Sequence, residues 1–260
     1  MRQLGRKRKN WKFIIIGLGL FSLGGCSYLN PFLYFQGEVG DKGTLPVAVE
    51  ELIEMAEYCA EAYRAATAEN KLYEIKSNEF SYHVRQDSGV TILIFRGTDN
   101  RKNIITDIDM RPWQDDELDM KLHRGFHDAS SLLLKDIKSK YKLEKTIYLT
   151  GHSLGGAIAQ IAGLWLNLEG YNVQIYTFGS PKVTPTFFGN SPPHYRVIID
   201  SDPVPYVPPW PYVHSGIMIN AETLEWAVGG EATRGSFTEI NGLDHSITYY
   251  LRTLRRWKDW

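Results

Sequence analysis

Residues 146–157 read Thr-Ile-Tyr-Leu-Thr-Gly-His-Ser-Leu-Gly-Gly-Ala, and the rest of the chain is best interpreted from them. β-Branched and aromatic residues at 146–150 predict a strand, and the apolar run from Gly156 to Leu168 predicts a helix. A Gly-x-Ser-x-Gly turn between a strand and a helix is the pattern of a nucleophile elbow, which lifts Ser153 clear of the sheet edge. Glycine suits positions 151 and 155 because side chains there would collide across so tight a turn. The alternative interpretation is a glycine-rich turn in which Ser153 only caps the helix.

The elements around this turn alternate between strands and helices. We expect strands at 80–85, 90–95, 146–150, 173–178, 195–199, 217–219 and 224–228, and helices at 46–66, 128–141, 156–168 and 246–257. The turn at 87–89 joins the first two strands, and the last two strands form an antiparallel hairpin. Strands that alternate with helices of 12 to 14 residues imply βαβ units. The sequence therefore predicts an α/β fold with a mostly parallel central sheet covered by helices on both faces.

A serine hydroxyl needs a histidine base, and the base needs a carboxylate that fixes its tautomer. Where a serine on such an elbow is catalytic, the acid of the triad follows it in the chain, and the histidine follows the acid. The histidines after Ser153 are His194, His214 and His245. His245 lies in a Gly-Leu-Asp-His-Ser turn that opens the last expected helix, so it is the preferred base, with His214 second. His194 follows two prolines and is expected at the surface.

Two aspartates that could orient the histidine follow the expected strand 195–199. They are Asp200 and Asp202, and Asp202 is followed by Pro203. The acid of such a triad normally lies in the loop beyond its strand, which favours Asp202 because it is further out. The alternative is that either aspartate only caps a turn before the proline.

Several blocks, in chain order, resemble the class 3 (fungal-type) lipases of the α/β-hydrolase superfamily. They are Ile94–Thr98, His123–Phe126, Thr150–Ala157, Tyr176–Val183, Asp202–Pro209 and Asp244–His245. The resemblance implies an α/β-hydrolase fold and hydrolysis of carboxylic esters of lipids, such as acylglycerols or phospholipids. It also implies that Ser153, His245 and Asp202 are the catalytic residues, and that no metal or organic cofactor is needed.

The same resemblance assigns an oxyanion hole and a lid. The backbone N–H groups of Leu154 and Thr98 would hold the oxyanion, with the Thr98 hydroxyl as a further donor. The family carries a lid directly after the oxyanion residue, which corresponds to residues 99–109 here. An apolar stripe within this segment consists of Ile104, Ile105 and Ile108. The alternative is a surface helix that packs these isoleucines on the core, and the charged residues of the segment argue against strong interfacial activation.

Other functions remain open on this pattern. Phospholipases and short-chain or feruloyl esterases share it, and an acyltransferase would use the same triad with an alcohol as acceptor. A non-catalytic, membrane-anchored binding protein on a hydrolase scaffold is an alternative of another class. His123 and His127 have the four-residue spacing of metal ligands on a helix, but Gly125 is expected to interrupt a helix there and no third ligand is apparent.

The first 25 residues resemble a bacterial lipoprotein signal. They combine a basic start, the apolar stretch Phe13–Leu23 and a Leu-Gly-Gly-Cys sequence that ends at Cys26. Cleavage before Cys26 and acylation of that cysteine are expected, although an ordinary secretory signal is an alternative, and the apolar stretch is short for a membrane span. In lipoproteins of Gram-negative bacteria, an aspartate directly after the acylated cysteine usually retains the protein in the inner membrane. Position 27 is serine here, so the resemblance predicts the outer membrane if the cell has one. Residues 26–44 then form a tether, and residues 45–260 form a single domain.

Composition sets further limits on function. Residues 1–25 hold six of the 29 Lys and Arg residues and none of the 30 acidic ones, so the remaining chain carries a formal charge of −7. This charge gives no sign of a nucleic-acid partner. Acylation of Cys26 would leave Cys59 as the one other cysteine, without a disulfide partner in the chain. The oligomeric state is left open by the sequence.

Overall fold

The computed structural model describes residues 38–64, 73–75, 78–97, 111–229 and 244–258. All of them lie in the second of two units of the chain, Met1–Phe32 and Leu33–Trp260. Cys26, Thr98, Ile104, Ile105 and Ile108 lie outside the described residues. Among the helices that are described, none has the length and apolar character needed to cross a membrane.

Within the described residues, the fold is built on a nine-stranded sheet with the order β1-β11-β10-β9-β8-β7-β4-β3-β2. Its strands are β1 (Val39–Gly40), β2 (Tyr73–Ile75), β3 (Asn78–Asp87), β4 (Val90–Arg96), β7 (Thr146–His152), β8 (Asn172–Phe178), β9 (His194–Ile198), β10 (Ile217–Asn220) and β11 (Trp226–Val228). The five central strands, from β4 to β10, are parallel, and the strands at both edges are antiparallel. The prediction of a mostly parallel sheet is therefore confirmed.

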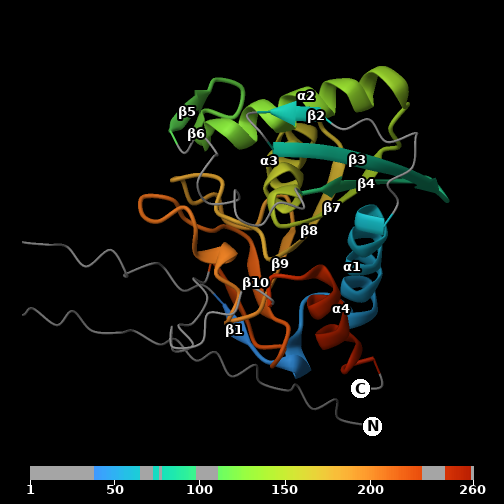
Figure 1. Cartoon of the computed structure of the whole chain (residues 1–260), viewed down its shortest axis with the longest axis vertical. Helices are drawn as coiled ribbons and strands as arrows, with labels where there is room; N and C mark the ends of the chain where they lie inside the picture. Colours follow the sequence, from blue (N-terminus) through green and yellow to red (C-terminus); the bar gives the residue numbers. More distant parts are fainter. Residues whose placement is uncertain (1–37, 65–72, 76–77, 98–110, 230–243, 259–260) are drawn as a thin grey trace, which may run out of the picture. The chain divides into compact units, whose positions relative to one another are not determined.

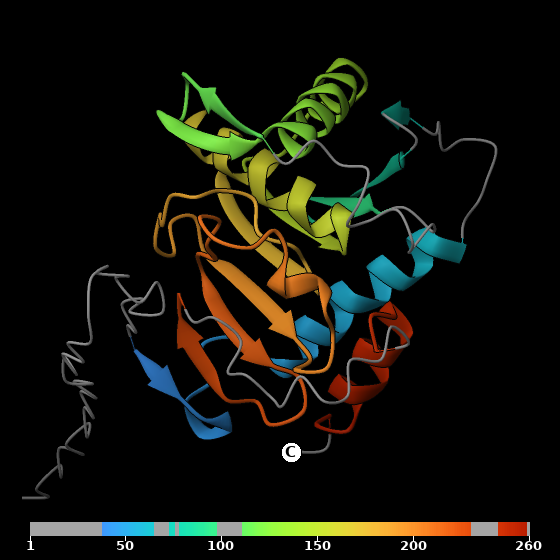
Figure 2. The ribbon, with the colours of Figure 1, turned by 60° about the vertical axis from the view of Figure 1, so that its left-hand side comes forward.

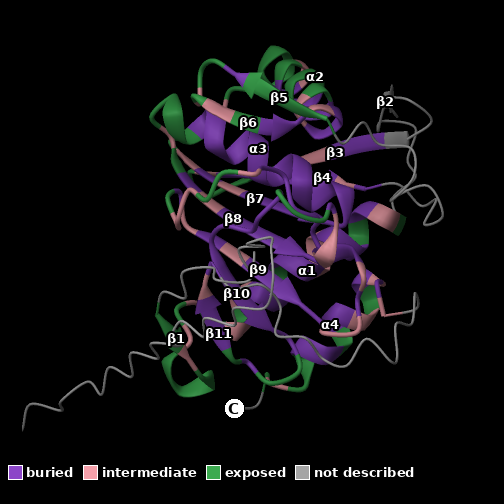
Figure 3. Cartoon of the chain, turned by 90° about the vertical axis from the view of Figure 1, so that its left-hand side faces the viewer, coloured by how far each residue is buried: buried purple, intermediate pink, exposed green. Residues whose placement is uncertain are grey.

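Helices cover both faces of this sheet (Figures 1 and 2). The described helices are α1 (Val49–Arg64), α2 (Arg124–Lys140), α3 (Leu154–Leu168) and α4 (Ile247–Arg255), with the short 3-10 helices η1 (Lys42–Thr44) and η2 (Val204–Tyr206). Successive strand residues point to opposite faces. On β4, Leu93 and Phe95 pack in the core cluster of α2 and α3, whereas Ile92 and Ile94 pack in the cluster of α1 and α4. Figure 3 shows the central strands buried between these two layers.

Three local features differ from the sequence expectations. Helix α2 begins at Arg124 rather than 128, because the His123 side chain accepts a hydrogen bond from the N–H of Phe126 and caps the helix. Gly125 does not interrupt the helix but lies buried in its first turn. A two-stranded hairpin, β5 (Pro112–Asp115) and β6 (Met120–His123), had not been expected.

Residues 39–44, which were expected to lie in the tether, belong to the described fold. Val39 and Gly40 form β1, which pairs with Ala227 and Trp226 of β11 at the sheet edge. The indole N–H of Trp226 donates to the Thr44 hydroxyl. The last residues of the expected tether are therefore part of the domain.

Candidate active site

Ser153 lies between β7 and α3, at the carboxyl end of a central strand. Its backbone has φ 57° and ψ −129°, a left-handed conformation that costs a non-glycine residue roughly 1–3 kcal/mol. A Cβ added at Gly151 would lie 2.3 Å from the carbonyl of Gly155, and one added at Gly155 would lie 2.1 Å from the Phe95 carbonyl oxygen. Only glycine fits at these two positions, so the turn is as tight as the sequence pattern requires.

The structure brings Ser153, His245 and Asp202 together. His245 Nε2 lies 2.8 Å from Ser153 Oγ, and His245 Nδ1 lies 2.8 Å from Asp202 Oδ2. A carboxylate can only accept, so Nδ1 carries the proton and Nε2 is left to accept from the serine hydroxyl. The three residues are at most 4 % exposed, which shields this chain of hydrogen bonds from water.

Further groups fix the Asp202 carboxylate. The Tyr250 hydroxyl donates to Oδ2 at 2.6 Å, and the N–H of Val204 donates to Oδ1 at 2.9 Å. Burial and the nearby Asp202 raise the pKa of Tyr250 well above 10, so its hydroxyl stays protonated and remains a donor. A Cβ at Gly179 would lie 2.6 Å from Oδ2. Tyr250 and Gly179 were not singled out from the sequence, because nothing local to them indicates contact with Asp202.

The alternative base and acid residues lie elsewhere and have other partners. His214 is buried and donates to the Pro205 carbonyl at 2.6 Å, and burial lowers its pKa well below 6.5. His194 was expected at the surface, but it is fully buried and hydrogen-bonds Thr177. Asp200 accepts from the Asn220 side chain at 3.0 Å.

Leu154 is the first residue of α3, and its N–H belongs to the first turn, where backbone N–H groups have no acceptor within the helix. The positive end of the helix dipole adds to the attraction for an anion at this point. Gly97 packs against the elbow, since its Cβ would lie 3.2 Å from the N–H nitrogen of Gly155. The next residue, Thr98, and the candidate lid residues Ile104, Ile105 and Ile108 lie outside the described part of the chain, so these assignments stay predictions.

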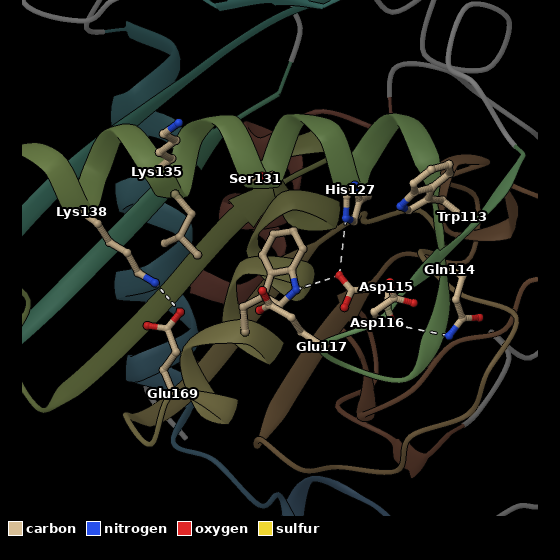
Figure 4. Close-up of a pocket in the computed structure, with 12 residues that line it drawn as sticks. Trp113, Gln114, Asp115, Asp116, Glu117, His127, Ser131, Lys135, Lys138 and Glu169 are labelled. Carbon is tan, nitrogen blue, oxygen red and sulfur yellow. Dashed lines mark hydrogen bonds and ion pairs between the residues drawn. The ribbon is translucent and has the colours of Figure 1, made fainter.

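A separate cleft of about 510 Å³ lies between the β5–β6 hairpin and helices α2 and α3 (Figure 4). Asp115 is one of its lining residues. Its carboxylate accepts from the Trp165 indole at 2.9 Å and lies 3.5 Å from His127 Nε2. None of the three triad residues lines this cleft.

The same contacts bear on the metal hypothesis for His123 and His127. His123 caps α2 and stacks on Phe126, whereas the His127 ring lies between the carboxylates of Asp115 and Asp128. Among the described residues, no group of three or more His, Cys, Asp or Glu side chains is placed to hold a metal ion. His123 is accounted for by helix capping, and His127 by its contacts with the two carboxylates.

Comparisons with known proteins relate part of this chain to lipases. Residues 92–212 match the family described as lipase (class 3), which confirms the resemblance over that stretch. A secreted mono- and diacylglycerol lipase 1 from Fusarium solani is 35% identical over 130 residues, which cover 45% of this chain and 39% of that protein. A lipase from Rhizopus niveus is 33% identical over 165 residues, which cover 54% and 41%. The chain thus matches about two fifths of the length of these relatives.

Solved structures show the fold. A lipase from Rhizopus microsporus var. chinensis superposes with a TM-score of 0.56 at 23% identity, covering 85% of this chain and 92% of that one. Rhizomucor miehei triacylglyceride lipase gives 0.54 at 21% identity, with 80% and 95% covered. The expected α/β-hydrolase fold is confirmed.

Proposed function

We propose that this protein is a serine hydrolase that cleaves carboxylic esters of lipids through an acyl-enzyme. The observation that carries the proposal is the hydrogen-bonded chain from Ser153 through His245 to Asp202, with 2.8 Å at each step, set on a strained strand-to-helix turn. Strain at a non-glycine residue persists only where the surrounding structure holds it, and such residues cluster at active sites.

In the acylation half-reaction, Ser153 Oγ attacks the ester carbonyl carbon while His245 Nε2 takes the hydroxyl proton. The carbonyl oxygen becomes an oxyanion, which the N–H groups of Leu154 and Thr98 would stabilise. The imidazolium is stabilised by Asp202 and returns the proton to the departing alcohol oxygen. The bond from the carbonyl carbon to that oxygen breaks, and the acyl group remains on Ser153.

In the deacylation half-reaction, a water molecule takes the place of the alcohol. His245 removes a proton from the water as the water oxygen attacks the acyl carbon. The bond from that carbon to Ser153 Oγ then breaks, and His245 returns the proton to Oγ. The products are the free fatty acid and the resting enzyme. An alcohol in place of water would give acyl transfer by the same steps.

A lipid substrate is supported by the similarity to class 3 lipases and by the names of the relatives, one of which is called a mono- and diacylglycerol lipase.

Hydrolysis of p-nitrophenyl esters from acetate to palmitate by the full-length protein tests this proposal. We expect turnover that extends to the long-chain esters, together with covalent labelling by a fluorophosphonate. Activity on acetate alone would identify a short-chain esterase, and an acyl-enzyme that transfers its acyl group to added alcohol in preference to water would identify an acyltransferase. A folded protein that neither turns over esters nor reacts with the fluorophosphonate would be a binding protein.

We further propose that the mature protein is anchored in the bacterial cell envelope by acylation of Cys26. The support is the basic start, the apolar stretch and the small residues before Cys26. Since a single acyl chain gives only marginal membrane binding, stable anchoring requires a second chain on Cys26 or another membrane contact.

Cys26→Ser is expected to abolish incorporation of labelled palmitate in a bacterial host and to shift the protein from the membrane to the soluble fraction. Cys59→Ser is the matched control, because Cys59 is buried, its Sγ lies 3.2 Å from Thr150 Oγ1, and burial raises its pKa to about 12. A Cys26→Ser protein that still incorporates palmitate would exclude this site of attachment.

A further inference from the structure

His152, the residue before Ser153, makes contacts that the triad chemistry does not account for. Its Nε2 lies 3.1 Å from the backbone carbonyl oxygen of His245, and its Nδ1 lies 3.0 Å from the Tyr63 hydroxyl. Its ring stacks on the His245 ring, with centroids 4.6 Å apart and planes 30° apart. The Tyr250 ring packs against it in a T-shaped arrangement, with ring centroids 6.1 Å apart.

These partners define the hydrogen-bonding state of His152. A carbonyl oxygen can only accept, so Nε2 carries a proton and donates it to His245. In the neutral ring, Nδ1 is then an acceptor, and the Tyr63 hydroxyl donates to it. The tautomer of His152 is thus set from both ends, and the orientation of its ring is fixed with it.

Tyr63 is itself held in place at the end of α1. Its ring lies under the Arg96 guanidinium, at 5.5 Å, and a Cβ at Gly97 would lie 3.1 Å from its hydroxyl. Arg96 ends β4, and Gly97 directly precedes the candidate oxyanion residue. One tyrosine therefore connects α1, the end of β4 and, through His152, the histidine of the triad.

We propose that His152 and Tyr63 are positioning residues, which hold the backbone and the ring of His245 in line with Ser153. The proposal rests on the proposed hydrolase function. A base must keep its nitrogen within hydrogen-bond distance of the serine hydroxyl throughout proton transfer, and a misplacement of about 1 Å costs about 10²-fold in rate. His152 restrains His245 at two places, the carbonyl by a hydrogen bond and the imidazole face by stacking.

Three variants separate positioning from simple packing. His152→Phe keeps an aromatic ring but removes the donor, and we expect kcat to fall by about 10²-fold with KM unchanged within about twofold. His152→Gln restores an N–H donor to the His245 carbonyl, and it should recover about tenfold of that loss. Tyr63→Phe removes the hydroxyl that donates to Nδ1 and should lower kcat by about tenfold. The double variant Tyr63→Phe/His152→Phe should be no slower than His152→Phe, because both changes act through one network.

Tyr58→Phe is the matched control, since it removes a hydroxyl on the same helix that bonds Glu54 and not the active site. We expect it to leave kcat unchanged. The proposal would be overturned if His152→Phe and Tyr63→Phe had the same kcat as wild type. It would also be overturned if thermal unfolding fully explained the loss of kcat and His152→Gln did not reduce that loss.

A proton NMR measurement keeps this proposal distinct from the proposed function. The proton on His245 Nδ1, shared with a carboxylate at 2.8 Å, is expected to give a strongly downfield resonance whether or not a substrate is known. His152→Phe should broaden or shift that resonance, and Tyr58→Phe should not. An unchanged resonance in His152→Phe would refute the positioning role. If the wild-type protein showed no ester turnover but its resonance still responded to His152→Phe, only the hydrolase function would be refuted.

Discussion

Ser153→Ala is expected to lower kcat for ester hydrolysis by about 10⁶-fold, because the elbow then has no hydroxyl to attack the carbonyl carbon. His245→Ala should cost about as much, and the double variant should be no slower than either single one, since the two residues act as a unit. The variants are expected to hydrolyse the ester about 10³-fold faster than it hydrolyses spontaneously in water, because the oxyanion hole and substrate binding remain. Initial rates with the best p-nitrophenyl ester, corrected for spontaneous hydrolysis, measure all three variants.

Ser130→Ala is the control for Ser153→Ala. Ser130 is another buried serine, and its hydroxyl donates to the Ile158 carbonyl of α3, outside the triad. It should retain wild-type kcat within about threefold, because removal of one buried hydrogen bond acts mainly on stability. Turnover by Ser153→Ala at the wild-type rate, in protein free of contaminating esterase, would remove Ser153 from the mechanism.

The turn around Ser153 could be predicted because its cause is local. Glycines 151 and 155, the β-branched strand before them and the apolar helix after them all lie within a few residues of the serine. The main strands could be read for the same reason, since their apolar runs are bounded by turn residues. The β5–β6 hairpin was missed because its strands, Pro-Trp-Gln-Asp and Met-Lys-Leu-His, are too short and mixed to show a pattern.

The surroundings of the triad could not be predicted, because they depend on contacts between distant segments. Chain order alone selects an acid and a histidine after the serine, but it says nothing of Tyr63, which is 89 residues from its partner His152. Tyr250 and Asp202 are 48 residues apart. The prediction for His194 was wrong. Two prolines before it suggested a surface loop, but β9 begins at His194, and the residue is buried beside β8.

Asp202→Asn is expected to lower kcat by about 10⁴-fold, because the amide cannot satisfy its neighbours in either orientation. With its NH₂ at the Oδ2 position, the asparagine donates to His245 Nδ1, which moves the histidine proton to Nε2 and removes the acceptor for Ser153. With the NH₂ at the Oδ1 position, it faces the donor N–H of Val204 instead. The first arrangement disables the base, and the second leaves two buried hydrogen-bond donors facing each other.

Asp200→Asn distinguishes between the two aspartates. Asp200 is half-buried, and burial raises its pKa, but its carboxylate bonds Asn220 and is not brought to His245. We expect kcat within about threefold of wild type for Asp200→Asn, since its effect is confined to one hydrogen bond away from the reacting atoms. Measurement of kcat for both variants, beside their thermal unfolding midpoints, separates lost chemistry from lost stability. A large loss of kcat in Asp200→Asn with a mild one in Asp202→Asn would reverse the assignment, because it would mean that the histidine is oriented by the other carboxylate during turnover.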